Sequence, residues 1–315
     1  MSTEGVDDAF HQAVMVAEVL AALAVRPGGV YADGTLGGGN HAAAILERSQ
    51  PDGRLYGCDL DPEAMSRAQV RLEPFAGRFV LREGSYVTLP EWVPAGSCDG
   101  VLLDLGVSSH ELDTAARGFS LRHDGPLDMR FSPHSSPTAA ALVNETPVAE
   151  LARIFRELGE EPAALRLARA IDQERRRTRI ETTGHLVAVT ERVLPPRGRG
   201  VHPATRLFQA LRMAVNREVE TIREGLLAAW KLLRENGRLV CIAFHGGEAR
   251  LVKEFGHRLS RNYEVVGPVD RPEFRRPQTP QLRWVHRHAV RPSREEVRVN
   301  RRSRSSLLYA FERIP

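Results

Sequence analysis

Val30-Tyr-Ala-Asp-Gly-Thr-Leu-Gly-Gly-Gly-Asn-His41 is the stretch from which the fold can be predicted. Its short apolar run ends at Asp33, a glycine turn follows at 37–39, and His41 opens a segment of helical composition. A strand, a tight glycine turn and a helix N-terminus favour a site for a nucleotide-like ligand, because glycine lets the backbone approach the ligand and the helix end offers free N–H donors. Glycine turns are common, so an ordinary strand-to-helix turn is the alternative on these residues alone.

A second acid, Asp59, and the spacing of the glycines help to distinguish between two classes of ligand. Asp59 ends the next expected strand about 20 residues beyond the glycines, the spacing that places a carboxylate on ribose hydroxyls. A nicotinamide cofactor prefers G-x-G-x-x-G, but Ala42 stands at the third glycine position. Sites for S-adenosylmethionine commonly read D-x-x-x-G-x-G, which Asp33, Gly37 and Gly39 match. With Asp33 facing the cationic methionine end and Asp59 the ribose, the pattern favours S-adenosylmethionine over a dinucleotide.

Composition indicates a globular cytoplasmic protein. A chain of 315 residues with 42% hydrophobic residues is long enough for one large domain or two medium ones. No apolar run approaches the ~20 residues that cross a bilayer, and the acidic first residues do not resemble a secretory signal. Cys58, Cys98 and Cys241 show no metal-binding spacing, so we expect buried free thiols in a reducing cytosol and no metal.

Charge is distributed unevenly along the chain. Residues 1–70 carry four arginines against ten acids, a net charge of −6, and the remainder carries +10. Arginines cluster between 166 and 179, and again at 301–304. A basic surface for a polyanion, away from the cofactor, is the functional interpretation, and a solvated charged surface is the alternative.

Strands and helices alternate along both ends of the chain. We expect strands at 30–33, 54–59, 79–81, 98–104, 238–245 and 307–312, with helices between them, which predicts a doubly wound, Rossmann-like parallel sheet. Ligands bind at the C-terminal ends of such strands. Asp33, Asp59, Tyr86 and Asp104 all lie at these ends, and His245 ends the later strand. Their convergence predicts the active site.

The middle of the chain has a different pattern. Residues 105–130 form a long irregular segment with interspersed apolar residues, which indicates a structured loop beside the active site. Residues 135–200 show amphipathic helical spacing that ends in a Pro/Gly/Arg-rich linker at 194–200, and a helix is expected to resume over 202–216. We therefore expect a discontinuous cofactor-binding domain at 1–112 and 213–315, interrupted by a mostly helical substrate-recognition subdomain at 113–212.

Taken together, the motifs resemble the bacterial MraW-type methyltransferases. These enzymes use S-adenosylmethionine to methylate the N4 amine of a cytidine in the decoding region of small-subunit ribosomal RNA. The resemblance runs from about His11 to Arg304 and rests on several long strings in one order. They are Asp-Gly-Thr-Leu-Gly-Gly-Gly-Asn-His (33–41), Leu-Leu-Asp-Leu-Gly-Val-Ser-Ser (102–109), Arg-Gly-Phe-Ser (117–120), Asp-Gly-Pro-Leu-Asp-Met-Arg (124–130), His-Pro-Ala-Thr-Arg and the following segment (202–216), Phe-His with Glu and Arg (244–250), and Asn with Arg-Ser-Arg-Ser (300–305).

The resemblance implies a cofactor site and its partners. It implies small-subunit ribosomal RNA as substrate, within the 30S subunit, and no membrane; a monomer and a homodimer are both compatible with it. Asn40 stands where the family usually has Gly, and Glu111 where an uncharged amide is common. The residues implied to bind S-adenosylmethionine are Gly37, Gly39, Asn40, His41, Asp59, Tyr86, Asp104 and Glu111.

Three residues are candidates for the chemistry. Asp104 is expected to contact both the cofactor and the amine, while Asp128 and His245 are candidates for orienting the base or accepting a proton. For His245 a structural role at the strand end is the alternative, and Asp128 could instead anchor its loop through Arg130. Rival functions are a nicotinamide-dependent oxidoreductase, a methyltransferase of another RNA or DNA amine, and a non-catalytic RNA-binding assembly protein.

Overall fold

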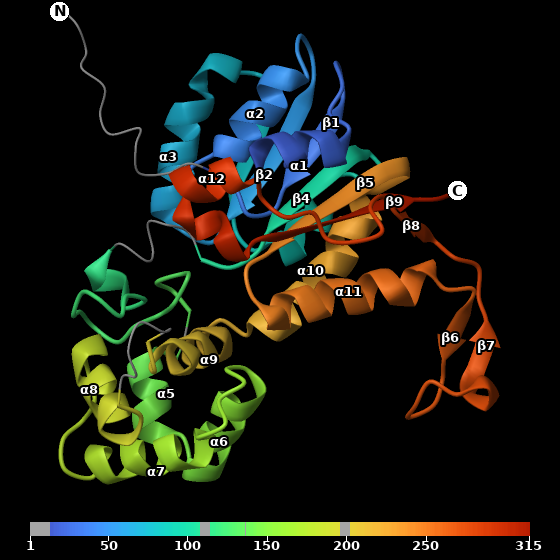
Figure 1. Ribbon diagram of the computed structural model, residues 1–315. Coiled ribbons are helices and arrows are strands. Elements are labelled where there is room, and N and C mark those ends of the chain that lie inside the picture. The colour runs from blue at the N-terminus through green and yellow to red at the C-terminus, as the bar shows by residue number, and fades with distance from the viewer. Residues whose placement is uncertain (1–12, 108–113, 136, 196–201) are drawn as a thin grey trace, which may run out of the picture. The chain divides into compact units, whose positions relative to one another are not determined.

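The computed structural model describes residues 13–107, 114–135, 137–195 and 202–315 (Figure 1). It divides into two compact units, one formed by residues 1–106 and 220–315 and the other by residues 107–219. The boundaries expected from sequence were 112/113 and 212/213. Each unit has a hydrophobic core of its own.

The first unit is built on a seven-stranded sheet in the order β3-β2-β1-β4-β5-β9-β8. The first five of these pair in parallel, and β9 lies antiparallel between β5 and β8. This topology confirms the predicted doubly wound sheet. Its strands are β1 (Val30–Asp33), β2 (Arg54–Asp59), β3 (Phe79–Glu83), β4 (Cys98–Asp104), β5 (Leu233–Ala243), β8 (Leu282–Trp284) and β9 (Leu307–Arg313).

The strand order changes direction at β1. The chain runs outward from β1 through β2 to β3 and then returns to the other side of β1 with β4. In open parallel sheets the crevice at such a reversal, outside the C-terminal ends of the strands, is where ligands bind. The ends of β1 and β4 therefore define the place to look for the site.

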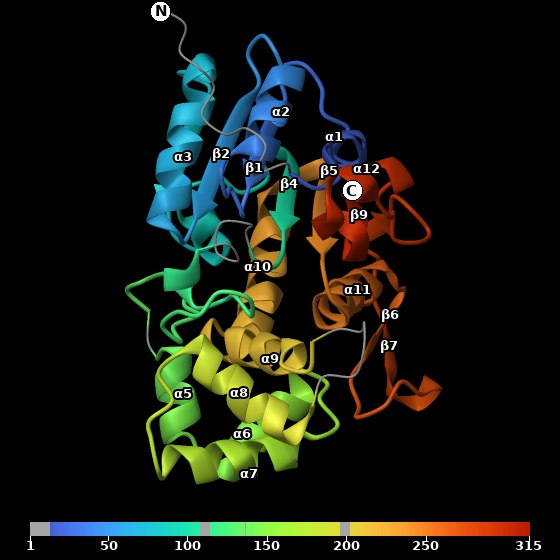
Figure 2. The same ribbon diagram turned by 60° about the vertical axis from the view of Figure 1, so that its left-hand side comes forward.

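Helices cover both faces of the sheet (Figure 2). One core joins α1, α2 and α3 to alternate strand residues such as Leu102 and Val240, while Trp230 and Phe255 join α10 and α11 to Phe311 on the opposite face. Asp61 caps α3, accepting a hydrogen bond from the Glu63 N–H at 3.0 Å. These elements are α1 (Val16–Leu23), α2 (Asn40–Arg48), α3 (Pro62–Leu72), η1 (Glu73–Phe75), η2 (Tyr86–Glu91), α10 (Glu218–Leu232) and α11 (Gly246–Ser260).

The second unit is helical. Thr138 caps α5 and Thr182 caps α8 through their hydroxyl oxygens, and the apolar faces of the helices enclose a core that includes Phe155 and Leu211. No described helix in either unit has the length and apolar character needed to cross a membrane. The helices are η3 (Ala115–Arg117), α5 (Ala139–Glu145), α6 (Val148–Glu157), α7 (Ala164–Arg175), α8 (Thr183–Val193) and α9 (Thr205–Val215).

The segment between α11 and β9 contains three short strands. β8 pairs with β9 and extends the main sheet, and β6 (Tyr263–Val265) pairs with β7 (Arg275–Pro277) in a separate two-stranded ribbon. These strands have three residues each, too few to show a periodic pattern. The same region contains η4 (Pro272–Phe274), α12 (Arg294–Val299) and η5 (Arg301–Ser305).

One arginine of the predicted basic cluster belongs to the interior of the helical unit. The Arg175 guanidinium donates to the carbonyls of Val143 and Thr146 at 2.9 and 2.7 Å and pairs with Asp172. Its side chain is only 14% exposed. Arg175 therefore joins helices rather than facing solvent, because its planar guanidinium satisfies carbonyls at the end of α5.

Candidate active site

Three carboxylates end adjacent parallel strands at one edge of the sheet. Asp33 ends β1, Asp59 ends β2 and Asp104 ends β4. β1 pairs in parallel with both β2 and β4, so its C-terminal end lies between theirs. The structure thus gathers these acids at the strand-order reversal.

Hydrogen bonds through the glycine turn connect the three acids. The Gly37 N–H donates to Asp59 Oδ2 at 2.8 Å, and the Thr35 N–H donates to Asp33 Oδ1 at 3.1 Å. The Asp104 N–H in turn donates to Thr35 Oγ1 at 2.7 Å. Thr35 therefore links the ends of β1 and β4, a role that sequence reasoning missed; its place in the Asp-Gly-Thr string was the available signal.

The backbone of the turn requires glycine at two positions. Gly37 and Gly39 have positive φ values of 50° and 80°, a conformation that side chains disfavour. A Cβ on Gly39 would also lie 3.2 Å from Ala68, whereas one on Gly38 would meet nothing within 4 Å. Asn40, where the family usually has Gly, begins α2 in helical conformation, so this position does not require glycine.

Two of the acids carry oxygens that no described residue satisfies. Asp33 Oδ2 and Asp104 Oδ1 are buried without a hydrogen-bond partner. Burial raises the pKa of Asp33 to about 7, and the nearby Asp59 carboxylate acts in the same direction. Burial also raises the pKa of Asp104 well above its usual range, with contributions from Asp33 and Glu248. Buried polar atoms are normally paired, so these oxygens indicate a site for a ligand with cationic or donor groups.

His41 lies beside Asp104 as a neutral ring. Its Nε2 is 2.9 Å from the Val14 carbonyl oxygen, and because a carbonyl only accepts, Nε2 carries the proton. Burial lowers the pKa of His41 to about 4, so the ring is neutral at pH 7. Its Nδ1 then presents a lone pair toward Asp104 Oδ2, 3.7 Å away. His41 thus both fastens the segment before α1 and lines the acidic edge.

Asp59 and Tyr86 occupy the flank of this edge. Asp59 accepts the Asp61 N–H through Oδ1 at 3.0 Å in addition to the Gly37 N–H. Tyr86 begins η2, and a Cβ on Gly225 would come within 2.0 Å of its ring, so the ring packs closely on α10. Glu111, the remaining residue expected to contact the cofactor, lies outside the described residues.

His245 forms the N-cap of α11. The Glu248 N–H approaches His245 Nδ1 at 3.5 Å, and Glu248 Oε2 accepts the N–H groups of Phe244 and His245 at 2.7 and 3.3 Å. This reciprocal arrangement is a capping box. The contacts of His245 therefore correspond to the structural role at the strand end that was considered as its alternative. Glu248, fully buried and electrostatically coupled to Asp104, is a site residue that sequence reasoning missed.

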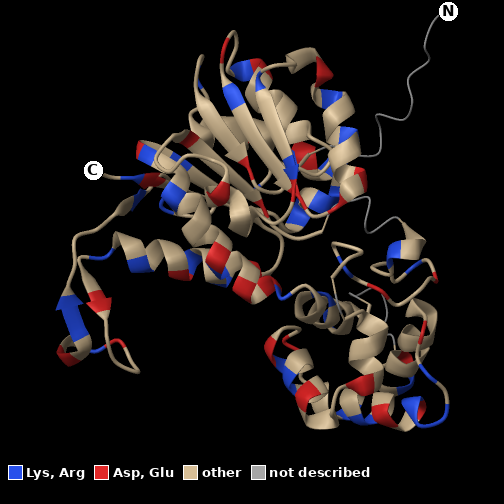
Figure 3. Cartoon of the chain, turned by 180° about the vertical axis from the view of Figure 1, so that it is seen from behind, with Lys and Arg blue, Asp and Glu red and all other residues tan. Residues whose placement is uncertain are grey.

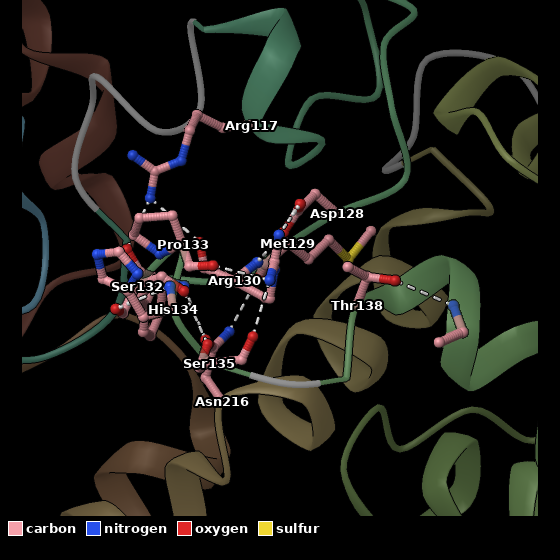
Figure 4. Close-up of polar contacts among 12 residues, drawn as sticks. Arg117, Asp128, Met129, Arg130, Ser132, Pro133, His134, Ser135, Thr138 and Asn216 are labelled. Atoms are coloured by element: carbon pink, nitrogen blue, oxygen red, sulfur yellow. Dashed lines mark hydrogen bonds and ion pairs between the residues drawn. The ribbon is translucent and has the colours of Figure 1, made fainter.

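Asp128, in the helical unit, is held by its own loop (Figure 4). The Arg130 guanidinium donates to both Asp128 oxygens at 2.7 Å and to the carbonyls of Pro133 and Ser135 at 2.9 and 2.8 Å. Burial alone would raise the pKa of Asp128, but the Arg130 hydrogen bonds outweigh it and hold the pKa below its usual value. In these contacts Asp128 is ionised and anchors its loop through Arg130, which is the alternative role considered for it.

Asn216 and Arg117 complete the same loop network. The Asn216 side chain accepts the Phe131 N–H and donates to the Met129 carbonyl, each at 2.8 Å. Arg117 donates to the Arg130 and Phe131 carbonyls at 3.1 and 2.8 Å. Met129 is held at a positive φ of 62°, an uncommon conformation for a residue with a side chain. The network fixes the backbone of the loop that follows Asp128.

The residues at the strand ends fit S-adenosylmethionine. The unsatisfied carboxylate oxygens of Asp33 and Asp104 suit its sulfonium and ammonium groups, and Asp59 has acceptor capacity left for hydroxyls. The open space above Gly38 and the N-terminus of α2 allow close approach to the backbone.

Comparisons with known proteins agree with this fit. A family model described as the MraW methylase family matches residues 8–314. Similar relatives named "Ribosomal RNA small subunit methyltransferase H" include one from Symbiobacterium thermophilum, 46% identical over 97% of this chain and 98% of the relative. Another, from Thermomicrobium roseum, is 46% identical over 96% of this chain and 94% of the relative.

Solved structures with similarity to this chain are more distant. A putative rRNA methylase from Clostridium thermocellum aligns with a TM-score of 0.45 and 13% identity, covering 96% of this chain and 99% of that chain. A putative methyltransferase from Streptococcus mutans in complex with SAH aligns with a TM-score of 0.41 and 12% identity, covering 96% of this chain and all (100%) of that chain.

Proposed function

Because this chain belongs to the MraW methylase family, we propose that it methylates the exocyclic N4 amine of a cytidine in the decoding region of small-subunit ribosomal RNA. The observation that supports a transfer site is the pair of buried, unsatisfied oxygens on Asp33 and Asp104 at the strand-order reversal. The relatives' names support the ribosomal substrate.

S-adenosylmethionine is the cofactor, and when bound it supplies an electrophilic methyl group. In the proposed site, Asp33 holds the cationic methionine end and Asp59 holds the ribose hydroxyls. Much of the rate can come from such placement, because positioned groups replace random encounters. The remaining proposed contacts are Gly37, Gly39, Asn40, His41, Tyr86, Asp104 and Glu111.

Asp104 is the residue that we propose for the chemistry. The N4 amine is a weak nucleophile, since its lone pair is delocalised into the cytosine ring, and an acceptor for its protons would localise that pair. Asp104 Oδ1 is buried and unsatisfied, and burial raises the pKa of this carboxyl. A carboxylate of raised pKa is suited to accept a hydrogen bond and then a proton. The target cytidine must be unstacked to reach it.

Asp128 and His245 rank below Asp104 as proton acceptors. Arg130 lowers the pKa of Asp128, which makes that carboxylate a weaker base. His245 is engaged with Glu248 in the cap of α11. We propose that both act by fixing backbone geometry, Asp128 in its loop and His245 at the start of a helix.

Arginine side chains on the helical unit support an RNA partner, and Figure 3 marks the positions of Lys and Arg along the chain. Arg166, Arg169 and Arg177 are exposed on and just after α7, and no ion pair joins them to another described residue. Such free guanidiniums can contact phosphates, which position the nucleic acid. We propose that they bind ribosomal RNA within the 30S subunit, and we infer a cytoplasmic location from that substrate.

The test is methyl transfer to 30S subunits from a strain lacking this protein. The subunits are incubated with labelled S-adenosylmethionine, and the modified nucleoside is identified by digestion and mass spectrometry. We expect N4-methylated cytidine at one position, near-complete loss in Asp104→Asn, and full activity in the control Asp52→Asn. This control changes an exposed acid that lies two residues before β2, at the opposite end of that strand from Asp59.

Other outcomes would distinguish the rival functions. A methylated nucleoside other than N4-methylcytidine would indicate a different amine substrate. Tight 30S binding without any methyl transfer would indicate an assembly protein, and would refute the proposed reaction.

A further inference from the structure

A charged cavity lies in the sheet unit, away from Asp33, Asp59 and Asp104. It has a volume of about 340 Å³, and four arginines and two acids contribute to its lining: Arg26, Arg234, Arg238, Arg283, Asp99 and Glu312. Asp99 is near the start of β4, whereas Asp104 ends that strand. Five residues of strand span about 17 Å, so this arginine pocket lies at the opposite edge of the sheet from the proposed methyl-transfer site.

Each acid of the arginine pocket is shared by two arginines. Asp99 pairs with Arg26 at 2.8 Å and with Arg234, and Glu312 pairs with Arg238 at 3.1 Å and with Arg283. The four guanidinium groups and the two carboxylates together give the lining a net charge of +2. The ion pairs therefore do not neutralise the cavity.

The acids lie beneath the arginines. The side chains of Asp99 and Glu312 are 10% and 8% exposed, while those of Arg26 and Arg283 are 55% and 66% exposed. Asp99 is itself fixed by the Val30 N–H at 2.8 Å. Buried carboxylates thus hold exposed guanidiniums in place, with N–H donors left over, because each guanidinium has five.

Because the two acids neutralise only half of the positive charge, the lining attracts a further anion. A phosphate group is the anion that matches, since guanidinium N–H pairs bind its oxygens in bidentate fashion. None of the described residues that line the cavity is aromatic, so it offers no surface for stacking a base. The lining thus suits a phosphate rather than a whole nucleotide.

We propose that the arginine pocket binds backbone phosphates of the RNA substrate, as a second contact remote from the methyl-transfer site. The identity of that RNA rests on the proposed function. Binding here would anchor a neighbouring part of the RNA and would leave the chemistry at Asp104 unaffected.

The test uses the full-length double variant Arg26→Gln with Arg283→Gln. Arg234 and Arg238 remain, so each buried acid keeps one partner and the fold should survive, which thermal unfolding and S-adenosylmethionine affinity will check. The matched control is Arg48→Gln, an exposed arginine at the end of α2. Affinity for 30S subunits is measured by filter binding across a salt series, together with kcat and KM for methyl transfer.

We expect the double variant to bind 30S subunits roughly tenfold more weakly at about 0.15 M salt, with a salt slope reduced by about 1.4, as for the loss of two phosphate contacts at ~0.7 counterions each. KM should rise and kcat should stay unchanged, and the control should match wild type. Unchanged 30S affinity and salt slope in a folded double variant would overturn the proposal.

A second ligand separates RNA from free phosphate. Inorganic pyrophosphate is titrated into wild type and the double variant, with unfolding temperature as the readout. Arginine-dependent stabilisation by pyrophosphate, combined with unchanged 30S affinity, would assign the pocket to a small phosphate ligand and refute the RNA contact. Failure of wild type to methylate 30S subunits would instead count against the proposed function.

Discussion

Cofactor affinity should depend on pH through Asp33. In the ligand-free protein, burial raises the pKa of this carboxyl to about 7, so it is mostly protonated at pH 6 and mostly ionised at pH 8. A cationic ligand stabilises the ionised form and lowers the pKa in the complex. Binding below pH 7 must therefore release a proton, and affinity must fall as the pH falls.

The size of the effect follows from the fraction of Asp33 that is ionised. With a free pKa of about 7 and a bound pKa well below 6, that fraction falls from about 90% at pH 8 to about 10% at pH 6. Affinity should then decrease about tenfold, or about 1.4 kcal/mol. Asp104, whose pKa is also raised by burial, acts in the same direction, so tenfold is a lower bound.

Isothermal titration calorimetry at pH 6, 7 and 8 measures this directly. Titrations in buffers of different ionisation enthalpy give the number of protons released. Methylthioadenosine, which lacks the sulfonium and the amino acid end, should bind with little pH dependence. Asp33→Asn should bind S-adenosylmethionine more weakly and with a smaller pH dependence. An affinity for wild type that is constant between pH 6 and 8, without proton release, would refute the assignment of Asp33 to the cationic end.

Three further predictions concern stability and binding. In the ligand-free protein, Asp33→Asn should increase the free energy of unfolding at pH 8 by up to about 4 kcal/mol. The reason is that the raised pKa of Asp33 in the folded state makes wild type lose stability as the pH rises from about 4 to 7. A urea unfolding experiment at pH 8 that shows no gain in stability would contradict the argument that burial raises this pKa. Asp59→Ala should weaken S-adenosylmethionine binding at least about tenfold, since one charge-assisted hydrogen bond is worth about 1.5–3 kcal/mol, while the circular dichroism spectrum stays native; equal calorimetric affinity would remove Asp59 from the site. Arg166→Gln with Arg169→Gln and Arg177→Gln should reduce the salt slope of RNA binding by about 2, and an unchanged slope in filter binding would assign these side chains to a solvated surface.

Much of the sheet unit was predictable because its signals are local. Short apolar segments and the glycine turn predicted β1, β2 and β4 with the bounds that the structure has, and a βαβ order implies parallel pairing. Acids at the ends of parallel strands must then share an edge. The convergence of Asp33, Asp59 and Asp104 follows from covalent spacing and strand geometry alone.

The short C-terminal strands could not be predicted in this way. β7 and β8 have three residues each in an arginine- and proline-rich segment, and a strand of that length exists only because another strand supplies its hydrogen bonds. Similarly, Arg175 looked like its exposed neighbours, but packing between helices directs it to backbone carbonyls. Asp128 and His245 likewise owe their partners to a loop network and a helix cap.

Spacing along the chain was thus sufficient for the class of fold and the kind of cofactor, and it led to the edge of the sheet where we propose that the cofactor binds. Three-dimensional packing settled which carboxylate oxygens stay unsatisfied, which arginines are buried, and how the pocket at the other edge is charged. The reason is that strand order and turn geometry arise from near neighbours, whereas burial and ion pairing depend on residues such as Arg26 and Asp99, or Arg283 and Glu312, that are remote in sequence.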